Sequence, residues 1–350
     1  MKYYLDRYEL FSKQINKAST ISGRPRLKLI FEVFLLKAIN KIEWKDYFFG
    51  KLYSHDISLS EKLNYFGCWQ KDRLLKKMNP YHLRVLTENK YIQKLIFAAL
   101  KVPMPRLYGF LHAENGISFS GNRLQNIRDV DTLLNELGVE SCVLKPVSSN
   151  YGEGIKFYSS SPVGDKKKSD YFITRDSIDS LKYIGSSGYV CEEQVVQHAF
   201  MNEINPCSLN TLRLWTYKKG AEVDVLGAFL RTSRGVKPVD NTSTGGIVAR
   251  VDVETGEIVS DLFAVDDSFL VFEVSPMGTL HVKGSLIPYW PEVIELSKSA
   301  ARCFSDLRLL ALDIGISEAG PVCIEVNSSG AFQGQFLMGY GFGKLKKTKA

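Results

Sequence analysis

The sequence predicts an α+β protein with two lobes, each built on its own sheet, preceded by a mostly helical N-terminal region. Helical and strand-like patterns occur in separate groups along the chain, which favours α+β lobes over one doubly wound sheet. Residues 1–87 carry few strand signals. Residues 311–327 read as two strands of alternating polarity joined by a short turn.

The individual elements follow from local patterns. A helical run from Glu88 ends near Pro103 and Pro105, because proline cannot continue a helix. Helices are also expected at residues 129–137, 177–183 and 291–308. Strands are expected at residues 106–110, 141–146, 156–158, 171–174, 189–196, 211–217, 222–231 and 246–252, and in the hairpin at 311–327.

We therefore predict four parts: a helical region at 1–87, a first lobe at 88–190, a second lobe at 191–343 and a basic tail at 344–350. The length of 350 residues is enough for two or three domains.

Composition narrows the function classes. Of the net charge of +7, four charges lie in the tail, so no strong electrostatic case exists for nucleic acid. We expect at most a weak association of the tail with an anionic membrane surface. The six cysteines form no C-x-x-C pair, and the charged start lacks an apolar signal segment, so we predict a cytoplasmic protein. Residues 27–39 read as an amphipathic helix packed on its own domain, with a membrane-surface helix as the less favoured alternative.

The hairpin at 311–327 holds the most informative residues. If it is centred on Ala319, Leu312 faces Val326, Ile314 faces Ile324 and Ile316 faces Val322, giving an apolar inner face. On the other face Asp313 then lies opposite Glu325, with Asn327 one step further. Carboxylates paired across a ladder repel each other, and a divalent cation between them removes that penalty. These oxygen ligands suit Mg²⁺, so Asp313, Glu325 and Asn327 are predicted metal ligands. The alternative is a surface hairpin with solvated acids.

A short strand at 142–146 delivers Lys145 and runs into a loop rich in Ser, Asn and Gly. Free N–H groups in such a loop suit a phosphate. The loop is neither a Walker A loop nor a dinucleotide fingerprint, and taken alone it fits an ordinary hairpin turn equally well. The predicted nucleotide contacts here are Lys145, Ser148, Ser149, Gly152 and Gly154, with Lys90 as a second lysine.

A strand from Tyr189 ends in the acidic pair Glu192-Glu193, where a carboxylate and free backbone groups would suit an adenine edge. Solvated acids on an edge strand are the local alternative. Arg213 and Arg231 lie in otherwise apolar strands and need an anionic partner. With Asn241, they are predicted either to face a transferring phosphoryl group or to form an internal salt-bridge network.

In this order, these residues resemble the ATP-grasp superfamily. The matching features are Lys90 before a helix, Val143-Leu-Lys145-Pro with its glycine loop, Glu192-Glu193, and Asp313 with Glu325-Val-Asn327. The chain is similar to the sugar-transfer-associated ATP-grasp family in three strings, at residues 205–213, 239–246 and 284–290. The resemblance covers about residues 88–340. The chain departs from the family in having Ser275-Pro276 where a His-Pro pair is common.

The resemblance implies an ATP-grasp fold, with two α+β lobes gripping ATP, and an ATP- and Mg²⁺-dependent ligase. Such enzymes phosphorylate a carboxylate and then join it to an amine. The resemblance also implies that Glu192 and the backbone of Val195 bind adenine. The implied substrates are an amine or amino acid and a carboxylate-bearing saccharide, such as a uronic acid, in surface-polysaccharide assembly. A phosphotransferase acting on a sugar or polyol hydroxyl, and a non-catalytic nucleotide-binding scaffold, stay open as alternatives. The oligomeric state is not predicted.

Overall fold

The structure is a computed structural model that describes residues 2–149, 152–160, 171–174, 188–233, 247–265, 271–273, 282–330 and 333–346. The helix expected at 177–183 lies outside these residues. No helix in the described ranges is long and apolar enough to cross a bilayer.

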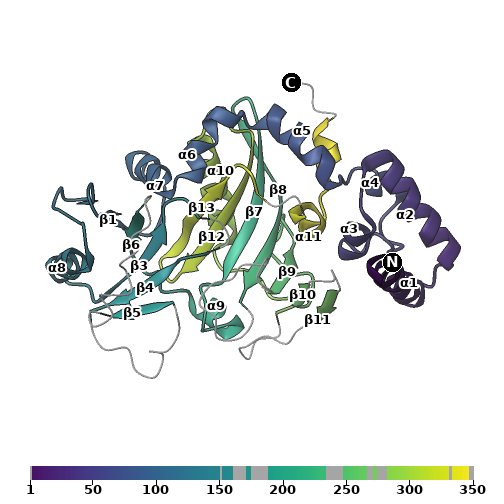
Figure 1. Cartoon of the computed structure of the whole chain (residues 1–350), viewed down its shortest axis with the longest axis horizontal. Coiled ribbons are helices and arrows are strands. Elements are labelled where there is room, and N and C mark those ends of the chain that lie inside the picture. The colour runs from purple at the N-terminus through teal and green to yellow at the C-terminus, as the bar shows by residue number, and fades with distance from the viewer. Residues whose placement is uncertain are drawn as a thin grey trace.

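The N-terminal region is helical, as predicted, and its first four helices lie at one end of the molecule (Figure 1). It begins with α1 (Lys2–Ser22), α2 (Arg26–Asn40) and α3 (Trp44–Phe49). The expected amphipathic helix is α2, whose Leu29, Val33 and Leu36 are buried against its neighbours. Shorter elements lead on to the first lobe: α4 (Leu59–Lys62), α5 (Cys68–Met78), η1 (Tyr81–Leu83), α6 (Val85–Glu88) and α7 (Lys90–Ala99).

The smaller sheet lies at the far end of the molecule from the N-terminal helices (Figure 1). Its strand order is β2-β1-β6-β3-β4-β5, and α8 (Ile127–Leu137) contributes Val130 and Leu134 to its core. The strands are β1 (Leu107–Leu111), β2 (Ile117–Ser118), β3 (Ser141–Pro146), β4 (Lys156–Ser159), β5 (Phe172–Thr174) and β6 (Tyr189–Glu192). The prediction that the last strand continues to residue 196 is wrong. The backbone leaves the ladder after Glu192, and the N–H of Glu193 bonds the carbonyl of Arg106 beyond the end of β1.

The larger sheet has the order β11-β10-β9-β8-β7-β12-β13, with antiparallel neighbours throughout its described strands. The expected helix at 291–308 is α10, which starts one residue earlier and ends at Arg302. The elements of this lobe are α9 (Ala199–Ile204), β7 (Thr211–Lys219), β8 (Glu222–Thr232), β9 (Ile247–Val251), β10 (Phe263–Val265), β11 (Val271–Glu273), α10 (Trp290–Arg302), β12 (Leu309–Ser317), β13 (Gly320–Asn327), α11 (Gly334–Met338) and η5 (Phe342–Lys346).

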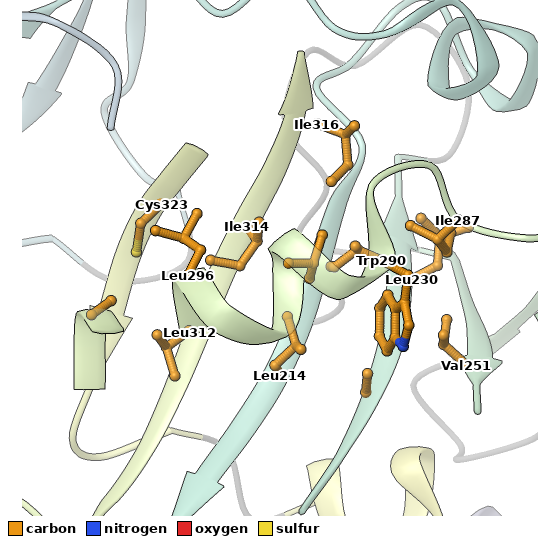
Figure 2. Packing of buried hydrophobic residues seen from close by; sticks show 14 of the residues in the cluster. Leu214, Leu230, Val251, Ile287, Trp290, Leu296, Leu312, Ile314, Ile316 and Cys323 are labelled. Atoms are coloured by element: carbon orange, nitrogen blue, oxygen red, sulfur yellow. The ribbon is translucent and has the colours of Figure 1, made fainter. Parts of the chain in front are cut away.

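Alternation along the strands gives the larger sheet two apolar faces. One face, with Leu214 and Leu312, packs under α10 through Trp290 and Leu296 (Figure 2). The other face carries Trp215 and packs with the N-terminal helices, α11 and η5. The N-terminal region and the second lobe therefore share one continuous apolar cluster.

The hairpin of β12 and β13 follows the predicted register only in part. Leu312 pairs with Val326, and Asp313 pairs with Glu325, as expected. A register shift after Asp313 then pairs Ile314 with Cys323, so the predicted pairs Ile314–Ile324 and Ile316–Val322 are wrong. Because one residue is extra on β13, Cys323 takes the fully buried place expected for Ile324.

Candidate functional site

An acid–arginine cluster lies on the large-sheet face that carries Trp215, further along the strands. The Asp313 carboxylate accepts two hydrogen bonds from Arg213, whose Nη2 lies 2.9 Å from Oδ2. Arg231 on β8 reaches the same oxygen at 3.0 Å, and its Nη2 also donates to the Thr211 hydroxyl at 2.8 Å. The Asp313 side chain is only 7% exposed, so charge-assisted hydrogen bonds from the arginines replace most of the hydration of its carboxylate.

The protonation of Asp313 follows from these contacts. Burial alone would raise the pKa of its carboxyl, but the charges and hydrogen bonds of Arg213 and Arg231 outweigh burial and lower the pKa below its ordinary value. Asp313 is therefore an anion at neutral pH, held by two cations.

Glu325 and Asn327 share this face, since they alternate with the buried Val326. Lys90 Nζ lies 3.4 Å from Glu325 Oε1, and the Glu325 side chain is 26% exposed. Among the described residues, no group of three or more His, Cys, Asp or Glu side chains is placed so that it could hold a metal ion. Asp313 and Glu325 supply two carboxylates and Asn327 an amide oxygen, and this all-oxygen donor set fits Mg²⁺ in type.

A second buried acid lies on the smaller sheet. Glu192 on β6 is 1% exposed, and its Oε1 lies 2.5 Å from Lys145 Nζ on β3. Lys94 Nζ on α7 lies 2.9 Å from Oε2, without the alignment of a hydrogen bond. Burial raises the pKa of Glu192, but Lys145 and Lys94 outweigh burial and leave the pKa lowered. For Lys94, burial is the largest influence and lowers its pKa.

The loop after β3 has a backbone conformation that requires glycine at two positions. Gly152 and Gly154 have φ of 69° and 75°, in the left-handed region that other residues rarely adopt. A Cβ on Gly154 would lie 2.8 Å from Cγ of Pro146. Lys90 Nζ donates to the Ser149 carbonyl at 2.6 Å, and the Lys90 N–H donates to the Val147 carbonyl. Ser148 is exposed. Lys90 therefore joins the loop to Glu325.

The segment after β6 presents backbone groups to its surroundings. Glu193 is exposed, and its carboxylate accepts the Arg106 N–H at 3.1 Å. Val195 is half-buried and Val196 is 77% exposed. In the described part of the chain, the Val195 N–H has no hydrogen-bond acceptor. This backbone, rather than the enclosed Glu192 carboxylate, is open to a ligand edge.

Buried amides fix the approach to β7. Asn205 and Asn210 are fully buried, and Nδ2 of Asn210 donates to the Met201 carbonyl at 2.7 Å. Gln197 bonds both the N–H and the side chain of Asn210, while Asn205 reaches Ser233 after β8. The string at 205–213 is therefore a hydrogen-bonded frame that positions Arg213, and its Asn residues are structural.

Helix α7 connects the two sheets. Lys94 meets Glu192 on the smaller sheet, and Tyr91 stacks on Phe110 of β1 with ring centroids 4.9 Å apart. Gln93 bonds both backbone groups of Val326 on β13, at 2.7 and 2.9 Å. Three ion-paired groups result, with five cations and three carboxylates in all: Lys90 with Glu325, Lys94 and Lys145 with Glu192, and Arg213 and Arg231 with Asp313.

The structure thus brings Asp313, Glu325, Asn327, Arg213 and Arg231 onto one face of the larger sheet, and Lys145 and Glu192 onto one face of the smaller. Asn241 lies outside the described residues. Sequence reasoning missed Lys94 and Thr211. The spacing of four residues between Lys90 and Lys94 on one helix was the available signal for Lys94; nothing local marks Thr211.

The family model described as Sugar-transfer associated ATP-grasp matches residues 69–350. No curated protein matches the chain significantly. Among solved structures, carboxyaminoimidazole ribonucleotide synthase from Aspergillus clavatus, complexed with ATP, is 12% identical with a TM-score of 0.43, over 74% of this chain and 52% of that one. L-amino acid ligase from Bacillus licheniformis is 13% identical with a TM-score of 0.43, over 84% and 51%. D-alanine–D-alanine ligase from Bacillus anthracis is 14% identical with a TM-score of 0.38, over 69% and 57%. The chain spans about half the length of these proteins.

Proposed function

The chain belongs to the sugar-transfer-associated ATP-grasp family, and we propose that it is an ATP- and Mg²⁺-dependent ligase that joins a carboxylate to an amine. The carboxylate is that of a uronic acid or similar saccharide, and the amine is an amino acid or related compound. The observation that carries the proposal is the set of three ion-paired groups on α7 and the two sheets, which together hold five cations and three carboxylates.

A surplus of positive charge in partly buried ion-paired groups suits a polyphosphate. Phosphorylating a carboxylate brings two anions together, so fixed cations must offset their repulsion. Lys145 and Lys90 are each paired with one acid, and a phosphate competes for them in the same geometry. When a phosphate takes Lys145, Glu192 keeps Lys94, so no buried acid is left alone.

The parts of a nucleotide are assigned by chemistry. Lys90, Lys145 and the loop at Ser148, Ser149, Gly152 and Gly154 bind phosphates, and the loop excludes water from the acyl phosphate. The backbone at Glu193 to Val195 takes the adenine edge, while Glu192 orients Lys145. Asp313, Glu325 and Asn327 would hold Mg²⁺, which screens charge on the phosphates.

Arg213 and Arg231 stabilise the acyl phosphate and the tetrahedral intermediate that follows amine attack. They sit beside the proposed metal ligands, with Arg231 also fixed by Thr211. In balanced form, a carboxylate oxygen attacks the γ-phosphorus and ADP leaves. The amine then attacks the acyl carbon, phosphate leaves, and the amine loses a proton.

The test is trapping of the acyl phosphate. The chain is incubated with Mg-ATP, a panel of uronic acids and hydroxylamine, and hydroxamate and ADP are measured. The proposal expects acid-dependent hydroxamate, with none from the Glu325→Gln variant. ADP release together with a stable phosphosugar and no hydroxamate would instead establish the phosphotransferase alternative.

A further inference from the structure

Helix α2 has a second apolar face opposite the one that packs on its own region. Leu27, Phe31 and Phe34 are 80%, 69% and 61% exposed, and with the exposed Ala38 they follow the spacing of one helical stripe. The packed stripe of Leu29, Val33 and Leu36 lies on the other side. Helices that are apolar all round are normally covered on every side. In Figure 1, α2 lies at the outer edge of the molecule.

The exposed charged side chains of α2 itself are all cationic. Arg26 and Lys28 are exposed, and in the described part of the chain neither forms an ion pair. Lys37 and Lys41 lie near the other end of the helix, where Lys37 pairs with the exposed Glu43 at 3.1 Å. The only acid of α2 is Glu32, and it is turned inward, where it bonds Arg24, Lys62 and Tyr47.

The same end of the molecule is basic as a whole. Residues 1–66 carry twelve Lys and Arg against seven Asp and Glu, a net charge of +5, while the whole chain carries +7. The basic C-terminal segment joins this end, because the Gly343 N–H bonds the Asn64 carbonyl.

We propose that the outer face of α2 docks on an anionic phospholipid surface. The exposed Phe and Leu side chains enter the boundary between headgroups and acyl chains, and the flanking cations meet the acidic headgroups. A second copy of this chain is a poorer occupant, because two α2 helices packed face to face would bring their cationic flanks together, and the exposed acid there, Glu43, is already paired with Lys37 of its own chain.

The experiment measures cosedimentation of the full chain with vesicles of phosphatidylglycerol and phosphatidylcholine, against vesicles of phosphatidylcholine alone. We expect binding to the acidic vesicles that weakens as salt is raised. Phe31→Ser with Phe34→Ser should lower the partition coefficient at least about tenfold, because two exposed aromatic side chains no longer leave water. Arg26→Glu with Lys28→Glu should lower it by a similar factor at low salt.

The matched control is Tyr81→Ser with Leu286→Ser, which removes two apolar side chains that are 82% and 63% exposed and lie outside α2. It should bind as the unchanged chain does, and circular dichroism should show all variants folded. Unchanged vesicle binding by the Phe31/Phe34 variant would show that another segment, such as the basic tail, binds the membrane, and this would overturn the proposal. Absence of binding to acidic vesicles would overturn it too, as would a dimer in light scattering that only the Phe31/Phe34 variant breaks.

Discussion

At the scale of single residues, the two acids facing each other across β12 and β13 are held in different ways. Asp313 is buried and bonded by two arginines, whereas Glu325 is partly exposed and has one lysine at 3.4 Å. Removing a partner from a buried ionic cluster leaves uncompensated charge, while a partly exposed pair contributes little. Substitution of either acid should therefore abolish activity, but only substitution of Asp313 should lower the stability of the fold substantially.

We expect Glu325→Gln to change the free energy of unfolding by less than about 1 kcal/mol and to abolish ATP-dependent turnover. Asp313→Asn should lower the free energy of unfolding by about 3 kcal/mol or more as well as abolishing turnover, because Arg213 and Arg231 lose their counter-charge. Urea unfolding and ADP release measure the two effects. Glu295→Gln, on the exposed side of α10, is the control. An active Glu325→Gln variant would remove Glu325 from the proposed metal site.

A buried acid in α3 predicts a pH effect of unusual sign. Burial raises the pKa of Asp46 to about 6, and the backbone of Glu43 offsets only part of that rise. Because the folded pKa lies above the unfolded one, the native state binds the extra proton between about pH 4 and 6, and stability falls as pH rises through that window. Glu192 and Asp313 act in the opposite sense, since their lowered pKa values stabilise the fold above about pH 4 and that stability is lost as the pH falls.

Asp46→Asn should therefore raise the free energy of unfolding at pH 8 by about 1–3 kcal/mol and leave it nearly unchanged at pH 4. Asparagine keeps the size of the side chain and removes its charge. Denaturant unfolding of both proteins at the two pH values measures the difference. An equal effect at pH 4 and pH 8 would show that packing, not ionisation, separates the variants.

At the scale of elements, the exposed edge of β13 is closed by a side chain. Gln93 of α7 bonds the N–H and C=O of Val326 and also the Thr87 carbonyl. Its amide thus takes the place of a neighbouring strand at the point where Glu325 and Asn327 project.

Gln93→Leu should lower the free energy of unfolding by about 2–4 kcal/mol, because it leaves two buried backbone groups of Val326 without partners. Leu95→Ala, at a partly exposed position of the same helix, should change it by about 1 kcal/mol or less. Hydrogen exchange of the Val326 amide adds a local readout. Unaltered protection there would mean that another group covers the edge.

Alternating polarity was sufficient to predict the hairpin and the facing of Asp313 and Glu325, because both depend only on a period of two. The register shift could not be predicted from alternating polarity, because Cys323 and Ile324 are both apolar and either residue could occupy the inner face of the hairpin. The burial of Glu192 and Lys94 could not be predicted from the sequence for a different reason. In a sequence they look like solvated charges, and only the packing of α7 on β6 shows them buried. The hydrogen-bonded frame at 205–210 is not predictable from the sequence, because no local pattern reveals a buried amide network.

At the scale of the whole molecule, the N-terminal helices belong to the core of the second lobe. Phe336 of α11 stacks on Tyr65 with centroids 5.2 Å apart and meets Phe49 edge-on. Gln335 bonds both backbone groups of Phe66. These contacts tie segments more than 260 positions apart in the chain.

Phe336→Ala should lower the free energy of unfolding by about 3–5 kcal/mol and make residues 1–66 more sensitive to protease than the rest. Phe304→Ala removes an equally buried ring from the opposite face of the sheet and should be similarly costly without that local effect. Limited proteolysis with mass spectrometry distinguishes them. Equal loosening of both ends in both variants would mean that the chain unfolds as one unit.

The anchoring of α7 to both sheets has a mechanical consequence. Gln93 contacts β13, while Tyr91 and Lys94 contact β1 and β6. A translation of either sheet along the helix would break both sets of contacts. Pivoting about the long axis of α7 shears them least. We therefore expect the long axis of α7 to be the rotation axis if one lobe moves over the other. Crystal structures without and with nucleotide should then superpose on α7, while the ends of the strands differ in position.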